Sequence, residues 1–205
     1  MCVSVSAKSQ IKFGVKAGLN MSQFSGVNFG DGRGAGGPSS FAYGFHTGRF
    51  INYPFSNLFG VQIEAVYSMQ GGRISQKEIV GSISEAKGTL RSNYLNIPLL
   101  LEIKPFKSPL SFLVGPQAGC CIYRSFNGYN YNYIEEQYKN FDFAIACGVK
   151  YTIKNQLTSD LRYNLGLTPS SIFDYTFSSE NEIVAKGTAK GERNRVLQLS
   201  VGWVF

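Results

Sequence analysis

The sequence is poor in charged residues, in histidine and in the patterns that hold metals. Charged side chains make up 16% of the 205 residues, which is below the roughly 25% usual in soluble domains. The single histidine, His46, and four cysteines without a CxxC pair do not provide a zinc site. We therefore expect neither a metal nor a cofactor, and the low charge suggests a chain with little surface in water.

Two further absences narrow the class of protein. No segment approaches the ~20 consecutive apolar residues of a membrane-spanning helix. The formal net charge is +7, but the basic residues are scattered and no nucleic-acid-binding module is recognisable, so we do not expect a nucleic-acid partner. Gly32, Gly34 and Gly37 satisfy a GxGxxG spacing. Because Pro38 and two serines follow instead of a helix, we interpret this stretch as a loop.

Alternation of apolar and polar residues is the main signal that is present. In NYLNIPLLLEIK, Leu95, Ile97 and Leu99 occupy every second position, and Asn96 and Glu102 face the other way. A strand points successive side chains to opposite faces, so this segment predicts a strand with one aliphatic face. The same alternation recurs along the chain, with some slippage in FAYGFHTGRFINY and LSFLVGPQAGCCIY. We expect strands near residues 11–21, 41–53, 58–70, 90–104, 110–123, 141–151, 157–168 and 194–205.

The connections between these strands alternate between long and short. Residues 22–40, 71–89, 124–140 and 169–193 form the long ones, and residues 54–57, 105–109 and 152–156 form the short ones. Such alternation predicts an antiparallel up-and-down barrel with all long loops at one end and both termini at the other. Cys120 and Cys147 fall on neighbouring strands, so they are either free thiols or, alternatively, a disulfide.

An eight-stranded barrel of this kind is either a soluble lipocalin-like carrier with an apolar interior or a membrane barrel with an apolar exterior. Four features favour the membrane. The strands are long enough to cross a bilayer, and the long loops gather at one end. Many polar-face positions carry glycine, which suits a narrow interior better than a water-facing strand. The chain also ends on an aromatic strand, Trp203-Val204-Phe205.

Several stretches resemble a known family. IKFGVKAGLNMSQFSG, GFHTGRFINYPFSNLFGVQIEAVYSMQGG, YLNIPLLLEIK, VGPQAG and FDFAIACGVKY are similar to the PorT-like outer-membrane β-barrel proteins of Bacteroidetes, also comparable with OmpA/OmpX-like barrels. The resemblance covers residues 11–205 and implies an all-β, eight-stranded antiparallel transmembrane β-barrel in the bacterial outer membrane. It implies no catalytic residues. Residues 1–10, whose Val5-Ser6-Ala7 resembles a signal cleavage end, are expected to be a signal-peptide remnant or a flexible N-terminus.

The polar face supplies the candidate functional residues. Charged groups in a narrow barrel must pair or be solvated, so we expect a plugging network and, as alternatives, a pore or an enzyme site. Glu64 and Glu102 are the candidates for an acid/base pair. His46 is expected to be a hydrogen-bonded interior residue at mid-strand, because no serine stands in the strained elbow that a nucleophile would need. The expected lumen network consists of Lys16, His46, Glu64, Glu102, Lys104, Asp142, Lys150, Asp160 and Arg162.

The outer loops and the two ends of the strands suggest partners. Tyr129, Tyr131, Tyr133 and Tyr138 alternate in one long loop, which predicts either an extended hairpin or a contact surface. We expect a monomer that contacts outer-membrane lipid and lipopolysaccharide, inserted by the outer-membrane machinery that reads the strand ending at Phe205. The expected role is structural or in surface interaction, without enzymatic activity; a lipocalin-like carrier or a small ion-conducting pore are the alternatives.

Overall fold

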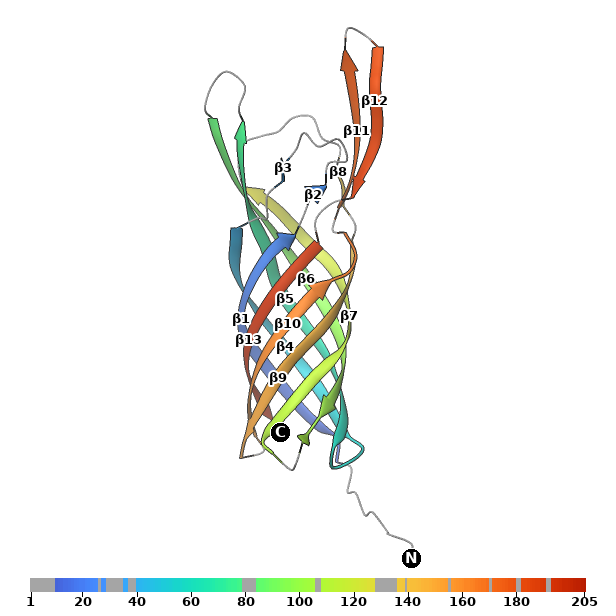
Figure 1. Ribbon diagram of the computed structural model, residues 1–205. Helices are drawn as coiled ribbons and strands as arrows, with labels where there is room; N and C mark the ends of the chain where they lie inside the picture. The colour runs from blue at the N-terminus through green and yellow to red at the C-terminus, as the bar shows by residue number, and fades with distance from the viewer. Residues whose placement is uncertain are drawn as a thin grey trace, which may run out of the picture.

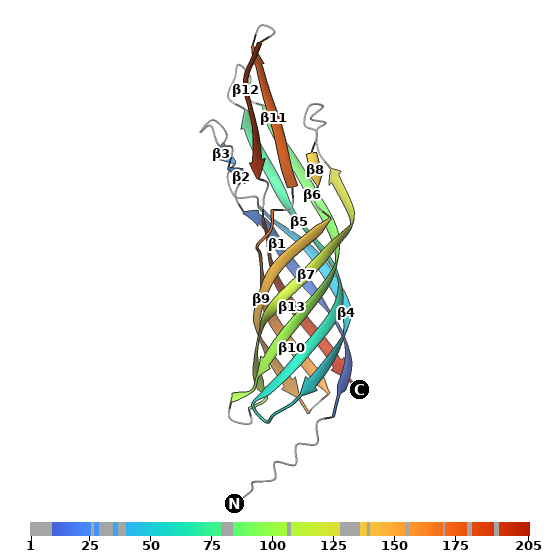
Figure 2. The ribbon, with the colours of Figure 1, turned by 90° about the vertical axis from the view of Figure 1, so that its right-hand side faces the viewer.

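The computed structural model describes residues 10–25, 27–28, 35–36, 40–78, 84–105, 108–127, 136–138, 140–154, 156–169, 171–179, 182–190 and 193–205. These residues form a closed barrel of tilted strands, with further strands rising from one of its ends (Figures 1 and 2). Across these ranges, no helix has both the length and the apolar character needed to span a membrane.

Eight antiparallel strands make the barrel, in the spatial order β1-β13-β10-β9-β7-β6-β5-β4. Their bounds are β1 (Lys12–Ser25), β4 (Ser40–Pro54), β5 (Phe59–Glu78), β6 (Ser84–Ile103), β7 (Leu110–Asn127), β9 (Phe141–Ile153), β10 (Leu157–Gly166) and β13 (Arg193–Val204). The first and last strands close the ring, pairing from Gly14 with Val204 to Ser25 with Arg193. The predicted fold class is confirmed, since each strand pairs with the next barrel strand along the chain.

The two ends of the barrel differ. One end, called here the short-turn end, carries the short connections between strands, at residues 54–59, 103–110 and 153–157. The start of β1 and the end of β13 lie at the same end (Figure 1). The opposite end, called the long-loop end, carries the wide connections. In the turn between β9 and β10, Lys154 has a φ of 48°, in the left-handed region that favours glycine.

Apolar side chains cover the outside of the barrel and polar side chains fill its inside. On β13, Leu199, Val201 and Trp203 are exposed, whereas Gln198 and Ser200, which alternate with them, are buried. The period of two places alternate residues on opposite faces of every strand. This arrangement is the reverse of a lipocalin-like carrier, whose interior is apolar, so the structure does not favour that alternative.

Two of the predicted long loops contain more strand than expected. β5 and β6 continue into residues 71–89 and remain paired as far as Glu78 with Ser84. Residues 169–193 contain a second hairpin, formed by β11 (Ser171–Ser179) and β12 (Glu182–Lys190). The apolar alternation that identifies a half-buried strand is weak in residues 71–89. In β11, however, Phe173, Tyr175 and Phe177 do alternate with Asp174 and Thr176, a strand signal that the loop prediction overlooked.

Shorter strands complete the long-loop end. β8 (Glu136–Tyr138), the described part of the loop that carries the alternating tyrosines, pairs with β11 in a three-stranded sheet. β2 (Val27–Asn28) pairs with β3 (Ala35–Gly36). Figure 2 shows these elements above the barrel, at the end opposite the start of β1 and the end of β13.

The slippage seen in two predicted strands corresponds to irregular pairing. The register between β4 and β5 shifts between Phe41 and His46. The register between β6 and β7 shifts where Asn93 pairs with Tyr123 and Tyr94 pairs with Cys121, which leaves Ile122 as the extra residue. Each shift adds one residue to one strand, as in a β-bulge.

The described cysteines are not bridged. Cys120, Cys121 and Cys147 are free thiols. Cys120 pairs with Phe141 of β9, six residues before Cys147 on that strand. Six residues of strand span about 20 Å, far beyond disulfide reach. The disulfide alternative is therefore wrong, although the two strands are neighbours as predicted.

Interior glycines allow adjacent strands of this narrow barrel to approach closely. A Cβ atom on Gly148 would collide with the carbonyl oxygen of Leu161 and lie 2.9 Å from the Cα of Arg162. A Cβ atom on Gly18 would collide with the carbonyl oxygen of Leu199 and lie 2.6 Å from the His46 ring. These glycines therefore leave the space in which the larger interior side chains meet.

Candidate functional site: the charged lumen

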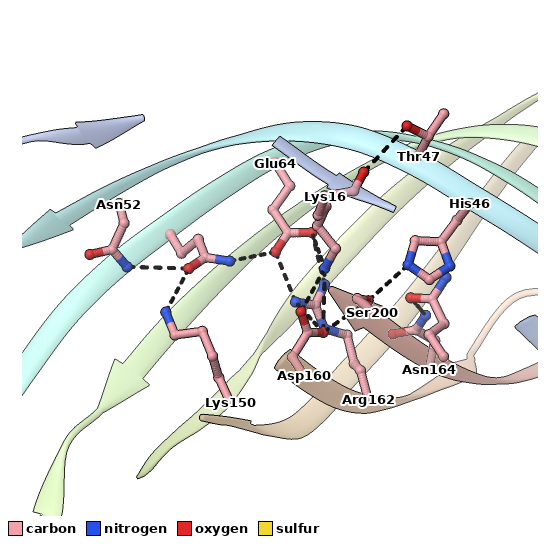
Figure 3. A network of polar contacts seen from close by, with 12 residues as sticks. Lys16, His46, Thr47, Asn52, Glu64, Lys150, Asp160, Arg162, Asn164 and Ser200 are labelled. Atoms are coloured by element: carbon pink, nitrogen blue, oxygen red, sulfur yellow. Dashed lines mark hydrogen bonds and ion pairs between the residues drawn. The ribbon is translucent and has the colours of Figure 1, made fainter. Parts of the chain in front are cut away.

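The centre of the lumen is crossed by an ion pair between two distant strands. Arg162 of β10 donates two hydrogen bonds to Glu64 of β5, from Nη1 to Oε2 at 2.9 Å and from Nη2 to Oε1 at 2.8 Å (Figure 3). Both side chains are almost completely buried. The planar guanidinium matches a carboxylate in this two-bond arrangement, which fixes geometry as well as charge. The pair therefore closes the middle of the barrel.

Lys16 and Asp160 complete the central cluster. The Nζ atom of Lys16 lies 3.3 Å from Oε2 of Glu64 and 3.2 Å from Oδ2 of Asp160. Asp160 also lies 3.5 Å from Nη2 of Arg162. Two cations thus face two carboxylates, and each charge has a partner of opposite sign, which is what burial of charge requires.

A second cluster lies toward the short-turn end. Nζ of Lys150 is 2.6 Å from Oε1 of Glu102 and donates to Oε1 of Gln62 at 2.9 Å. Gln62 in turn donates to Oε1 of Glu64 at 2.6 Å, which links the two clusters. Asn52 also donates to Glu102. Burial of three cations with three carboxylates leaves the two clusters without net charge.

A cavity opens at the short-turn end of this second cluster. Its volume is about 290 Å³, and Glu102 and Lys150 form its inner wall. Lys104 lies at its rim, 3.7 Å from Glu102 and partly exposed. The cavity is therefore an entrance for solvent from the short-turn end, and the buried clusters lie at its inner limit.

His46 lies in a hydrogen-bonded chain above the central cluster. Its Nδ1 atom is 2.7 Å from Oδ1 of Asn20, and its Nε2 atom is 2.8 Å from Oγ of Ser200. Asn20 donates its amide hydrogens to Phe45, Ser68 and Met69, so its oxygen is left to accept from Nδ1 of His46. Ser200 also lies 3.3 Å from Asp160.

This chain has the connectivity of a nucleophile, a base and an orienting amide. His46 is thus the hydrogen-bonded interior residue that the sequence predicted, but its contact with Ser200 was not foreseen. Gly18 pairs with both His46 and Ser200 and, lacking a side chain, leaves room for them to meet. However, Ser200 and His46 are both about 1% exposed. The serine is therefore held in the packed interior.

Asp142 lies apart from the other charged groups, toward the long-loop end. Its carboxylate accepts a hydrogen bond of 2.6 Å from Thr168 and one of 3.1 Å from Asn194. Asn194 also donates to the hydroxyl of Tyr94, which is 2% exposed. Phe24, Tyr94 and Val196 are buried at this end, so apolar and aromatic groups close the lumen there.

The structure therefore brings most of the predicted network together, in two linked clusters. Lys16, Glu64, Asp160 and Arg162 form the central one, and Glu102, Lys104 and Lys150 form the one at the short-turn end. Glu64 and Glu102 do not form an acid/base pair. Glu102 pairs with Gly60, four residues from Glu64 along β5, which is about 13 Å.

The sequence analysis selected lumen residues by their charge, so it missed the uncharged polar residues of the network. Asn20, Asn52, Gln62 and Ser200 are all buried and link the charged groups to one another. The alternation places each of them on the polar face of its strand, so the same pattern that identified Glu64 could have identified them. Among the described residues, no group of His, Cys, Asp and Glu is placed to hold a metal ion.

The tyrosines predicted as loop contacts are not placed by the structure. Tyr129, Tyr131 and Tyr133 lie outside the described residues, and for Tyr138 only the backbone is described, as the last residue of β8. Residues 1–9 also lie outside the described ranges, so the predicted signal remnant over residues 1–10 stays a prediction.

Comparison with known families identifies the class of barrel. Residues 6–171 match the model of the family described as "Outer membrane protein beta-barrel domain". This match covers well over half of the chain. No curated protein matches the chain at a significant level.

The chain is also similar to solved structures of outer-membrane barrels. The crystal structure of neisserial surface protein A matches with a TM-score of 0.50 and 15% sequence identity, over 94% of this chain and 97% of that one. Ail of Yersinia pestis matches with a TM-score of 0.44 and 14% identity, over 95% and 98% of the two chains. Outer membrane protein W of E. coli gives 0.43 and 12%, over 97% and 100%. Only the first is close enough to support the fold.

Proposed function

The chain belongs to the outer membrane protein β-barrel domain family and lies in the bacterial outer membrane, and from this premise we propose a structural or surface-interaction role for a barrel with a filled lumen. In this proposal the barrel holds the long-loop end at the cell surface and does not conduct ions or catalyse a reaction. The short turns and both termini face the periplasm, as is usual for such barrels.

The observation that carries the proposal is the ion pair between Arg162 and Glu64. It joins strands on opposite sides of the ring, and its atoms are buried. Below it, Lys150 and Glu102 form a second barrier, and above it Tyr94 is fully buried. An ion that crossed the lumen would have to separate charges that have no bulk water to replace their partners, which is costly.

The remaining contacts of the barrel follow from its location. We propose a monomer whose apolar exterior contacts outer-membrane lipid and lipopolysaccharide. The insertion machinery would read the last strand, β13, and the Phe205 that follows it. β13 pairs with β1 only when the ring closes, so that edge of the strand is free until then. The motifs that resemble PorT-like proteins, such as YLNIPLLLEIK and VGPQAG, support placement of the chain in that Bacteroidetes group.

The proposal also excludes an enzyme in the lumen. Ser200, His46 and Asn20 have suitable connectivity, but a hydrolase needs a route for its substrate. Glu102 and Lys150 line the cavity at the short-turn end, and Lys150 lies on the other side of the central cluster from His46 (Figure 3).

A small ion-conducting pore is the second candidate. The cavity of about 290 Å³ favours it, because charged groups there are open to solvent from one end. A pore would require the pair between Arg162 and Glu64 to open, and the lumen to widen at Tyr94.

Recording from planar bilayers separates the two candidates. The purified protein is folded in detergent, its barrel is confirmed by heat-modifiable migration on gels, and it is then inserted into bilayers. The filled-barrel proposal predicts no single-channel steps from the folded protein. Reproducible steps that disappear after heat unfolding would contradict it and support the pore.

A further inference from the structure

Four arginines lie on the outer face of the barrel at its long-loop end. They are named here the rim arginines and comprise Arg73 of β5, Arg91 of β6, and Arg193 and Arg195 of β13. All four side chains are exposed. They share the outward face with lipid-facing residues of the same strands, such as Leu95 on β6 and Leu199 on β13. The apolar band of the barrel therefore ends at an arginine on each of these strands.

The register places the rim arginines in two pairs. Arg73 pairs with Thr89, and Arg91 pairs with Gly71, so Arg73 and Arg91 are diagonal neighbours on adjacent strands. Such neighbours are about 7–8 Å apart, within reach of long side chains. Arg193 and Arg195 are two residues apart on one face, which corresponds to about 7 Å.

The two pairs lie at the same height, at the long-loop end of the barrel. Arg193 pairs with Ser25, the last residue of β1, and Arg73 pairs with Ser40, the first residue of β4. β1 and β4 are the strands between β13 and β5 in the ring. Three spacings between strands separate the pairs, which is about 14 Å along the sheet.

The rim arginines have no acidic neighbour in the ladder. The residues paired with them are Ser25, Gln23, Leu165, Ser40, Thr89, Gly71 and Ser125. Within the described part of the chain, no carboxylate forms an ion pair with any of the four. This is the opposite of the lumen, where every central cation faces a carboxylate.

We propose that the rim arginines bind the phosphate groups of the phosphorylated glycolipid in the outer leaflet, one phosphate at each pair. The inference rests on the proposed orientation, in which the long-loop end faces outward. Arginine is suited to this role because its planar fork binds phosphate oxygens through two hydrogen bonds. The acyl chains of the same lipid would lie on the apolar face directly below, so one ligand satisfies both parts of the surface.

Binding of lipid A to the folded barrel tests this proposal. The probes are diphosphoryl lipid A, the same lipid with its phosphates removed, and phosphatidylglycerol, each titrated against protein refolded without native lipid. The test variant combines Arg73→Gln, Arg91→Gln, Arg193→Gln and Arg195→Gln. The matched control is Arg49→Gln, because Arg49 is also exposed and outward-facing but lies on β4 away from the rim, paired with Val15 and Ala65.

The wild-type protein should bind diphosphoryl lipid A at least about tenfold more tightly than the dephosphorylated lipid, since each basic residue at an anionic surface strengthens binding by roughly fivefold. The fourfold variant should lose that preference, and Arg49→Gln should keep it. A variant with only Arg73→Gln and Arg91→Gln, and one with only Arg193→Gln and Arg195→Gln, should each lose part of it. Equal binding of both lipid A forms, or an unchanged fourfold variant, would overturn the proposal. Equal competition by phosphatidylglycerol would also overturn it, because any anionic lipid would then suffice.

The test is separate from that of the filled lumen. Folding is checked on the same samples by heat-modifiable migration, and the exposed substitutions leave the interior unchanged. If the folded, non-conducting wild-type protein showed no preference for diphosphoryl lipid A, the result would count against the rim arginines alone, whereas conductance by a wild-type protein that keeps the preference would count against the proposed function alone.

Discussion

Arg162 and Glu64 form two hydrogen bonds across the full width of the lumen, from strands four places apart in a ring of eight. The two residues are 98 positions apart in the sequence. Only closure of the barrel brings them together, so the pair reports on the assembled ring rather than on any single hairpin.

Replacing Arg162 with methionine should destabilise the barrel by about 3 kcal/mol, because it leaves the Glu64 carboxylate buried with one cation fewer. The double variant Glu64→Gln with Arg162→Met should lose less stability than the sum of the two single variants. Urea unfolding of protein in lipid vesicles gives the three free energies. Additivity within about 0.5 kcal/mol would mean that the two residues do not interact.

Leu99→Arg should cost about 2–4 kcal/mol, because it places a charge on the lipid-facing side of β6 near mid-membrane. Leu58→Arg is the matched control: Leu58 is also about half exposed but lies in the short turn between β4 and β5. Its cost should be below about 1 kcal/mol, as is typical near the membrane interface. Unfolding free energies in vesicles measure both, and a neutral Leu99→Arg would show that this face does not meet lipid.

Gly148→Ala should destabilise the barrel by about 1–3 kcal/mol, because the added methyl group collides with the backbone of β10 and overpacks the sheet. Gly60→Ala serves as the control. A Cβ atom on Gly60 would lie no closer than 3.3 Å to its neighbours, so a small adjustment accommodates it. Equal stabilities of the two variants would contradict the close approach of β9 and β10.

Ser200 should not react with a fluorophosphonate probe in the folded protein, because the packed lumen excludes the reagent from the Ser200–His46 pair. Mass spectrometry of the labelled chain provides the measurement. Labelling of Ser200 that is lost in a His46→Ala variant would show an accessible, activated nucleophile, and the account of a non-catalytic lumen would then be wrong.

The barrel itself could be predicted from the sequence because its physical cause is local. Residues such as Leu95 and Ile97 alternate with polar ones, and this period of two sets both the strand and its faces. Glycines such as Gly148 then showed which face points inward, because a crowded interior explains glycine on a strand and a water-facing surface does not. The opposite face therefore meets lipid. Strand starts and ends in the membrane region were accordingly close to those observed.

The contacts inside the lumen could not be predicted in the same way. Which cation faces Glu64 depends on ring closure and on the register of strands far apart in the chain. The meeting of His46 with Ser200 depends on Gly18 between them, a relation that appears only when both neighbours of β1 are known. The hairpin of β11 and β12 was missed because its residues were assigned to a loop from their place between two barrel strands, although Phe173, Tyr175 and Phe177 alternate with polar residues in β11.

The most direct test of the central account is a scan of spin labels along β13, at residues 196–203 in a background without cysteine. In lipid vesicles, collision of the spin label with apolar oxygen should be frequent at positions 197, 199, 201 and 203 and rare at the positions between them. Collision with a water-soluble nickel complex should be rare at every scanned position near mid-membrane. This pattern follows from Leu199 and Val201 facing outward and Ser200 facing inward. High oxygen collision at position 200 with low collision at 199, or access of the nickel complex to position 199, would contradict a barrel with an apolar exterior and a filled polar lumen.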